Sequence, residues 1–129
     1  MRVLVTGGRD FTDFQSVSLM LSRMDLINLP PITELCHGGA RGADTLCGAW
    51  AKGHGIPVTV MKPDWNKHGK AAGVLRNQDM LDQFKPDALV AFPGGRGTAD
   101  MVRRAESAGV PVYRHLDGSD KDKILRKDT

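Results

Sequence analysis

Short apolar runs alternate with segments of helical periodicity along most of the chain. The runs rich in valine, leucine and isoleucine predict strands at 2–6, 32–36, 58–61, 88–92 and 110–113. Apolar residues repeating every three or four positions predict helices at 12–26, 43–54, 73–84 and 98–108, and the polar stretch 62–72 is expected to be a loop. This alternation predicts an α/β fold, namely a single Rossmann-like domain of about five parallel strands with helices on both faces.

Glycines gather where the predicted strands end. The 15 glycines cluster at 7–8, 38–42, 69–73 and 94–97, and three of these clusters lie between a strand and the following helix. The carboxyl ends of parallel strands share one edge of the sheet, so we expect the three turns to converge there. The predicted domain covers residues 1–116, and 117–129 form a polar tail without expected regular structure.

A glycine-rich turn that leads into a helix is an anion-binding device. The first backbone N–H groups of the helix lack intrahelical acceptors, the helix dipole favours negative charge, and glycine lets a ligand approach the backbone. The candidate ligand-binding residues in the turns are Gly7, Gly8, Arg9, Gly38, Gly39, Ala40, Gly42, Asp44, Gly94, Gly95, Arg96, Gly97 and Thr98. They predict a site for a phosphate or nucleotide.

Side chains outside the turns extend this prediction. Trp65 lies in a polar segment, where it could close the edge of the core or stack on a base. His68, with neighbouring lysines, is placed to close over phosphates, and Arg76 and Asn77 lie early in the next predicted helix. Asp44 could serve as a helix-dipole partner or contact ribose hydroxyls, and both roles stay open.

Composition narrows the class of protein. With 40% hydrophobic and 26% charged residues, the 129-residue chain is typical of a globular domain. No apolar run or charged leader indicates a membrane span or export, so we expect a cytoplasmic protein. Cys36 and Cys47 lack metal or redox spacing, so we expect reduced cysteines and no metal. A net charge of +3 without a dense basic run argues against nucleic acid as a partner.

Three motifs, in the same order, resemble the SLOG superfamily of DprA and the Lonely Guy proteins. The segment 93–98 is similar to the P-G-G-x-G-T signature of Lonely Guy enzymes, and 39–44 is similar to the glycine-rich A-R-G-x-D segment of DprA. The segment 76–80 is similar to the R-x-x-x-M helix start of Lonely Guy proteins and the R-N segment of DprA. Over residues 1–115, the nearest likeness is to the small YspA/YpsA-related branch, often encoded by bacteria and their phages.

The resemblance implies a binder of a nucleotide or nucleotide derivative, either ADP-ribose/NAD-like or a nucleoside monophosphate, with no further cofactor. One alternative is a phosphoribohydrolase that cleaves the N-glycosidic bond of nucleoside 5'-monophosphates, for which Asp100, Arg76 and Asp44 are the catalytic candidates. The family's catalytic glutamate position holds Met101 here, which argues against turnover. DprA-like binding of single-stranded DNA is a second alternative.

The family also implies a homo-oligomer. A face with Met20 and Met24 could serve the contact between copies, although core packing would explain the same residues.

Overall fold

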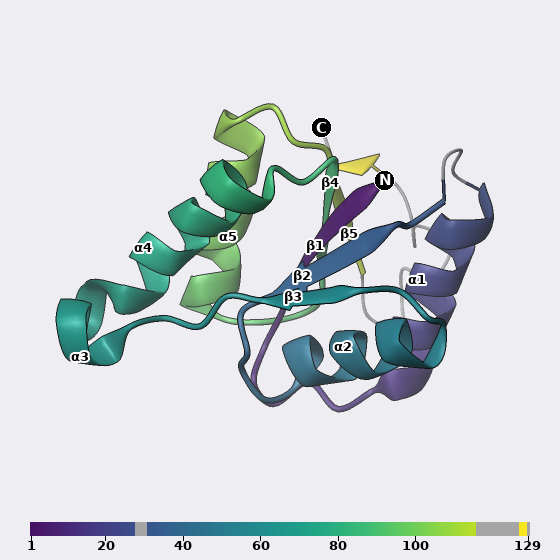
Figure 1. Ribbon diagram of the computed structural model, residues 1–129, viewed down its shortest axis with the longest axis horizontal. Helices are drawn as coiled ribbons and strands as arrows, with labels where there is room; N and C mark the ends of the chain where they lie inside the picture. Colours follow the sequence, from purple (N-terminus) through teal and green to yellow (C-terminus); the bar gives the residue numbers. More distant parts are fainter. Residues whose placement is uncertain (28–30, 116–126, 129) are drawn as a thin grey trace.

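The computed structural model describes residues 1–27, 31–115 and 127–128 (Figure 1). The strands are β1 (Arg2–Thr6), β2 (Glu34–His37), β3 (Val58–Val60), β4 (Ala88–Ala91), β5 (Val112–Arg114) and β6 (Lys127–Asp128). The α-helices are α1 (Phe14–Ile27), α2 (Ala43–Gly53), α3 (Trp65–His68), α4 (Ala72–Asp79) and α5 (Arg96–Ser107). A 3-10 turn, η1 (Gly69–Ala71), precedes α4, and a π-helical turn, η2 (Met80–Phe84), follows it.

The strands form one sheet in the order β3-β2-β1-β4-β5-β6. Strands β1 to β5 pair in parallel, and in the centre Leu4 of β1 lies opposite Cys36 of β2 and Leu89 of β4. Strand β6 pairs antiparallel with β5. The predicted Rossmann-like α/β fold with five parallel strands is therefore confirmed, and β6 is an addition that the apolar pattern did not predict.

Helices cover both faces of this sheet, with α1 and α2 on one face and α4 and α5 on the other (Figure 1). Side chains along a strand alternate between the faces. Val3 and Val5 of β1 therefore join the core under α1 and α2, whereas Leu4 joins the core under α4 and α5. Because all three are buried, the central strand reads as an uninterrupted apolar run.

Several predicted bounds differ from the structure by a few residues, the helix predicted at 73–84 ends in the π-helical turn η2, and two differences concern the cavity. The segment 62–72 contains α3 and η1 instead of a loop, because the Asp64 side chain accepts a hydrogen bond from the Lys67 N–H and caps α3. Helix α5 begins at Arg96 rather than at residue 98, with Gly95 as its N-cap. In the predicted tail, 117–126 and 129 lie outside the described residues, and 127–128 form β6.

Several side chains whose roles the sequence did not decide are buried in the core. Met20 and Met24 are buried in the cluster beneath α1 and α2, so core packing explains them. Cys36 and Cys47 are free and buried, and burial raises the pKa of the Cys36 thiol to about 12, far from a reactive thiolate. Within the described residues, no helix is long and apolar enough to cross a membrane.

Candidate functional site

The three glycine turns meet around one cavity of about 770 Å³ at the carboxyl edge of the parallel strands. The lining residues come from all three turns and from the segment between β3 and α4. They are Thr6, Gly7, Gly8, Arg9, Gly38, Gly39, Ala40, Arg41, Asp44, Lys62, Pro63, Trp65, Gly73, Arg76, Asn77, Gly95, Gly97 and Thr98. The predicted convergence of the turns is thus present in the structure, and the volume is large enough for a nucleotide-sized molecule.

Gly8 fastens the three turns to one another. Its N–H donates to the Pro93 carbonyl in the third turn at 2.8 Å, and its carbonyl accepts from the Ala43 N–H at the start of α2 at 3.1 Å. The backbones approach so closely that a Cβ on Gly8 would lie 2.9 Å from the Pro93 oxygen. A larger residue at position 8 would therefore separate the turns.

The N-terminus of α5 leaves backbone N–H groups open to this cavity. The first bond of the helix runs from the Ala99 N–H to the Gly95 carbonyl, so the N–H groups of Arg96, Gly97 and Thr98 have no intrahelical acceptor. A Cβ added at Gly95 or Gly97 would meet no atom within 4 Å, which leaves the backbone open to a ligand. Thr98 lies within the first helical turn and lines the cavity, as predicted for a ligand-binding residue, and Gly95 is the N-cap residue.

The second turn is organised by Asp44 rather than left free. One carboxylate oxygen of the buried Asp44 accepts from the N–H groups of Gly38 at 3.1 Å and Ala40 at 3.2 Å. Burial raises the pKa of this carboxyl group, although the two N–H donors oppose that shift. The N-terminus of α2 therefore already holds a negative group, which leaves α5 as the stronger place for a phosphate.

Arg76 is fixed at the opposite wall. Its guanidinium donates to the Gly38 carbonyl at 2.8 Å and to the Met61 carbonyl at 3.4 Å, and its Nε donates to the Asn77 side chain. A Cβ at Gly38 would lie only 2.2 Å from the guanidinium, so glycine is required for this approach. Burial lowers the pKa of Arg76, while the nearby Asp44 opposes that shift. The group stays cationic and presents its charge to the cavity.

The charged side chains that line the cavity are mostly cationic. Arg9, Arg41 and Lys62 add three cations to Arg76, with Asp44 as the one carboxylate among the lining residues. Lys62 was not predicted, although it follows β3 and so lies at the same sheet edge as the turns.

Trp65 is half exposed on α3, so it lines the cavity instead of closing the core.

Five predicted site residues lie outside the cavity lining: Gly42, His68, Gly94, Arg96 and Asp100. Gly42 and Gly94 lie beneath the lining and allow close packing there. A Cβ at Gly42 would lie 2.3 Å from the Gly8 carbonyl oxygen, and a Cβ at Gly94 would lie 2.2 Å from the Thr98 hydroxyl. Gly42 also has φ of 79°, a conformation that favours glycine. His68 and Arg96 are exposed on α3 and α5.

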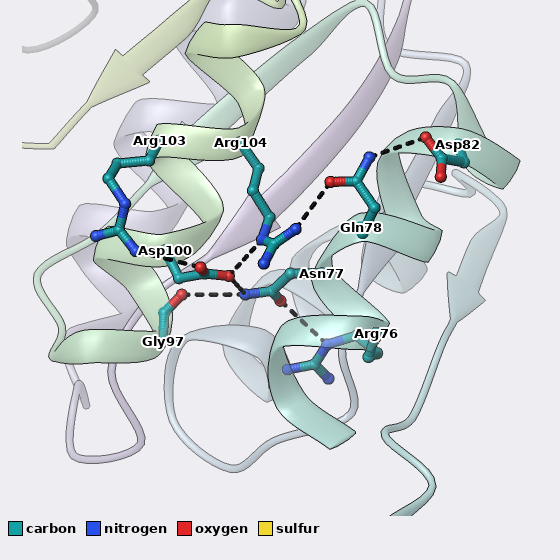
Figure 2. A network of polar contacts seen from close by, with 8 residues as sticks. All are labelled: Arg76, Asn77, Gln78, Asp82, Gly97, Asp100, Arg103 and Arg104. Atoms are coloured by element: carbon teal, nitrogen blue, oxygen red, sulfur yellow. Dashed lines mark hydrogen bonds and ion pairs between the residues drawn. The ribbon is translucent and has the colours of Figure 1, made fainter. Parts of the chain in front are cut away.

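Asp100 belongs to a polar network that joins α4 to α5 (Figure 2). Its carboxylate accepts from the Asn77 side-chain amide at 2.9 Å, from Arg104 at 2.8 Å and from Arg103 at 3.2 Å. Burial opposes the charge, but these hydrogen bonds and the two arginines together lower the pKa of Asp100. The same Asn77 amide also donates to the Gly97 carbonyl, so the network supports the wall of the cavity from behind.

The next residue, Met101, has no exposed surface and packs beneath α5. Neither Asp100 nor Met101 therefore presents a carboxylate to the cavity.

Comparisons with known proteins agree with this fold. The model of the family described as "YspA, cpYpsA-related SLOG family" matches residues 1–68. The Gene 61 protein of Mycobacterium phage D29 is 43% identical over 123 residues, covering 90% of this chain and 97% of that protein. A UDP-GlcNAc 2-epimerase from Neisseria meningitidis, solved bound to UDP-GlcNAc, has a similar fold with a TM-score of 0.53 at 16% identity; the alignment covers 98% of this chain and 36% of the epimerase chain.

Proposed function

Because the chain belongs to the YspA, cpYpsA-related SLOG family, we propose that its cavity binds a nucleotide or a nucleotide derivative of the ADP-ribose or nucleoside monophosphate kind. The proposal places the phosphate at the N-terminus of α5, where the backbone of Gly95 and Gly97 is open. Arg76 and Lys62 then neutralise the remaining negative charge, and Trp65 contacts the base.

The convergence of the three turns on one cationic cavity carries this proposal. A single glycine-rich turn is common, but here four cationic side chains face one carboxylate in the same lining. That carboxylate belongs to Asp44, and one of its oxygens already accepts hydrogen bonds from two backbone N–H groups. The arrangement favours a ligand with several negative oxygens.

A substitution at Gly95 tests the phosphate position without disturbing the fold. The φ of −98° suits any residue, no atom lies within 4 Å of a Cβ there, and aspartate is a favourable N-cap. Gly95→Asp should keep or raise the unfolding temperature and weaken binding of AMP or ADP-ribose about tenfold or more, because its charge faces the phosphate. Gly95→Asn is the matched neutral control and should bind more tightly than Gly95→Asp.

Two measurements complete the test. Native mass spectrometry of freshly purified protein identifies a retained nucleotide by mass, and calorimetry with AMP and ADP-ribose gives the affinity of each variant. Equal affinities for wild type and Gly95→Asp would reject the phosphate position at α5.

Hydrolysis of nucleoside monophosphates is the second candidate function, and Asp44 is the observation that favours it. Asp44 lines the cavity with a raised pKa, as a carboxyl group in proton transfer requires, whereas Asp100 is held in the α4–α5 network. Incubation with AMP should then release adenine, and Asp44→Asn should lose that release while the exposed Arg103→Gln keeps it. The absence of free base from every nucleoside monophosphate would leave binding alone.

A further inference from the structure

The cationic side chains of the cavity gather around the second of its three turns, residues 38–42. They are Arg9, Arg41, Lys62 and Arg76. A Cβ at Gly38 would lie 2.2 Å from the Arg76 guanidinium, and a Cβ at Gly39 would lie 2.8 Å from Cγ of Lys62. Two positive side chains, one from α4 and one from the segment after β3, therefore lie against the backbone of this turn.

Arg9 and Arg41 add two exposed guanidinium groups beside the same turn. The Arg9 carbonyl oxygen would lie 2.5 Å from a Cβ at Gly42, so the first turn packs directly against the second. None of the residues that the structure describes accepts a hydrogen bond from the Arg9 side chain or forms an ion pair with it. Arg41 pairs with Asp10 at 3.3 Å, but these side chains are 76% and 96% exposed, so the pair is weak and can exchange for a ligand.

The backbone N–H groups of the second turn are already in use. Asp44 accepts hydrogen bonds from the N–H groups of Gly38 and Ala40. The Gly39 N–H donates to Nδ1 of His37 at 2.9 Å. An anion beside this turn is therefore held by the charged side chains around it.

The third turn has the reverse character and lies next to Arg76. The N–H groups at the start of α5 are open, but the arginine of this turn, Arg96, lies outside the cavity lining. The Arg76 Nε donates to the Asn77 side-chain oxygen at 3.2 Å, and the Asn77 amide donates to the Gly97 carbonyl at 3.2 Å. One side chain thus separates Arg76 from the first turn of α5. The cavity offers two neighbouring places for an anion, one with backbone donors and one with cationic side chains.

Arg9 and Arg76, which both line the cavity, repel each other. Burial is the main cause of the lowered pKa of Arg76, the charge of Arg9 adds to this shift, and Asp44 opposes it. A negative group between two guanidinium groups removes such a repulsion and accepts hydrogen bonds from both. The place beside the second turn therefore favours a phosphate over an uncharged part of a ligand.

We propose that the cavity selects ligands with two directly linked phosphate groups, either a nucleoside diphosphate or a diphosphate diester of the ADP-ribose kind. This inference rests on the nucleotide function proposed above. One phosphate binds at the N-terminus of α5, and the second binds among Arg9, Lys62 and Arg76. A nucleoside monophosphate occupies only one of the two places.

Four adenosine ligands test the selection in calorimetric titrations without divalent cations: AMP, ADP, ADP-ribose and adenosine 3',5'-bisphosphate. ADP, ADP-ribose or both should bind about tenfold or more tightly than AMP. ADP-ribose carries about as much charge as AMP, so a gain with it reports the second position rather than added charge. The tighter of the two distinguishes a terminal from a bridging diphosphate. Adenosine 3',5'-bisphosphate, whose phosphates are apart, should bind more weakly than this ligand.

A variant of the first turn locates the second phosphate. Arg9→Gln should bring the affinity of the preferred diphosphate close to that of AMP, and it should fold because the Arg9 side chain is exposed. Arg23→Gln removes the same charge from an exposed position on α1, outside the lining, and should keep the wild-type ratio of affinities. An unchanged ratio in Arg9→Gln would reject the position of the second phosphate.

The ligand series separates this inference from the function on which it rests. Equal affinities for AMP, ADP and ADP-ribose, or tightest binding of adenosine 3',5'-bisphosphate, would overturn the selection of a diphosphate and leave nucleotide binding standing. The absence of binding by all four ligands at millimolar concentration would reject both proposals.

Discussion

At the scale of single residues, the contact between Gly38 and Arg76 shows how the backbone places a charge in the cavity. The guanidinium lies where a side chain on residue 38 would otherwise stand, and the Gly38 carbonyl accepts its hydrogen bond. Gly38 therefore lets the guanidinium of Arg76 approach the backbone closely, and its carbonyl group orients that guanidinium. The fixed fork of Arg76 is ready for an anion before any ligand arrives.

Gly38→Ala should test this contact. The added methyl group would lie 2.2 Å from the guanidinium, so Arg76 must move and lose its bond to residue 38. We expect a loss of unfolding free energy of about 1–3 kcal/mol in urea titrations, together with weaker AMP or ADP-ribose binding. Gly53→Ala is the control, and equal losses in both variants would contradict a specific role for Gly38.

His37 should make stability depend on pH. Its pKa is lowered in the folded chain, so the unfolded chain binds the proton more readily. The free energy of unfolding should therefore fall as the pH drops below the ordinary histidine value of 6.5 toward the lowered folded value. His37→Asn keeps an acceptor for the Gly39 N–H but does not titrate, so urea unfolding between pH 7 and 5 should show a weaker dependence. Identical pH profiles would reject this assignment.

At the scale of elements, the carboxylate of Asp100 lies at the centre of the polar junction between α4 and α5. Asp100 binds Asn77 of α4 and two arginines of α5, and Asn77 also holds the Gly97 carbonyl (Figure 2). These bonds set the first turn of α5 relative to Arg76. The orientation of the proposed phosphate site therefore depends on a residue that does not line the cavity.

Asp100→Asn should loosen this junction. The amide cannot accept from all three donors, so we expect about 1–3 kcal/mol less unfolding free energy near neutral pH. The wild-type advantage should persist above the ordinary carboxyl pKa and disappear as the pH falls through the lowered pKa of Asp100. Urea unfolding across this range checks both statements. Arg103→Gln is the control, because Arg103 is 69% exposed and its ion pair should contribute less than about 1 kcal/mol.

Strands and turns were predictable because their signals are local. Apolar runs that stop at glycine pairs locate β1, β2 and β4, and parallel pairing alone brings the following turns together. Helix α3 was missed because it has four residues and no apolar stripe, although Asp64 carries a capping signal. Strand β6 has two residues, too few for a periodic pattern.

Pairings between distant segments were the part of the site that sequence could not supply. Asp44 has two backbone donors within its own turn, but Asn77, which donates to Asp100, lies 23 positions away on α4. Lys62 reaches the cavity only because β3 ends at the same sheet edge. Such contacts depend on helix packing and strand register, which no local motif encodes.

At the scale of the whole molecule, a ligand in the cavity should stabilise the entire domain. The site draws on elements from β1 to α5, so an unfolded chain cannot form it. A nucleotide at a hundred times its dissociation constant should add about 2.7 kcal/mol to the unfolding free energy. Thermal denaturation with increasing ADP-ribose or AMP should show a rise of about 10 °C. At the same ligand concentration, Gly95→Asp with about tenfold weaker binding should show about half that rise or less, and an equal rise would place the ligand elsewhere.

The hydrogen bonds of Gly8 have a consequence for fragments of this protein. Gly8 lies in the part of the chain that holds the first two turns, whereas its acceptor Pro93 and the open N-terminus of α5 lie in the part that holds the third. A chain divided at the exposed η1 turn would leave each piece with an incomplete cavity. The proposed nucleotide binding would return only when the two pieces reassociate. Binding would therefore report that the two fragments have come together.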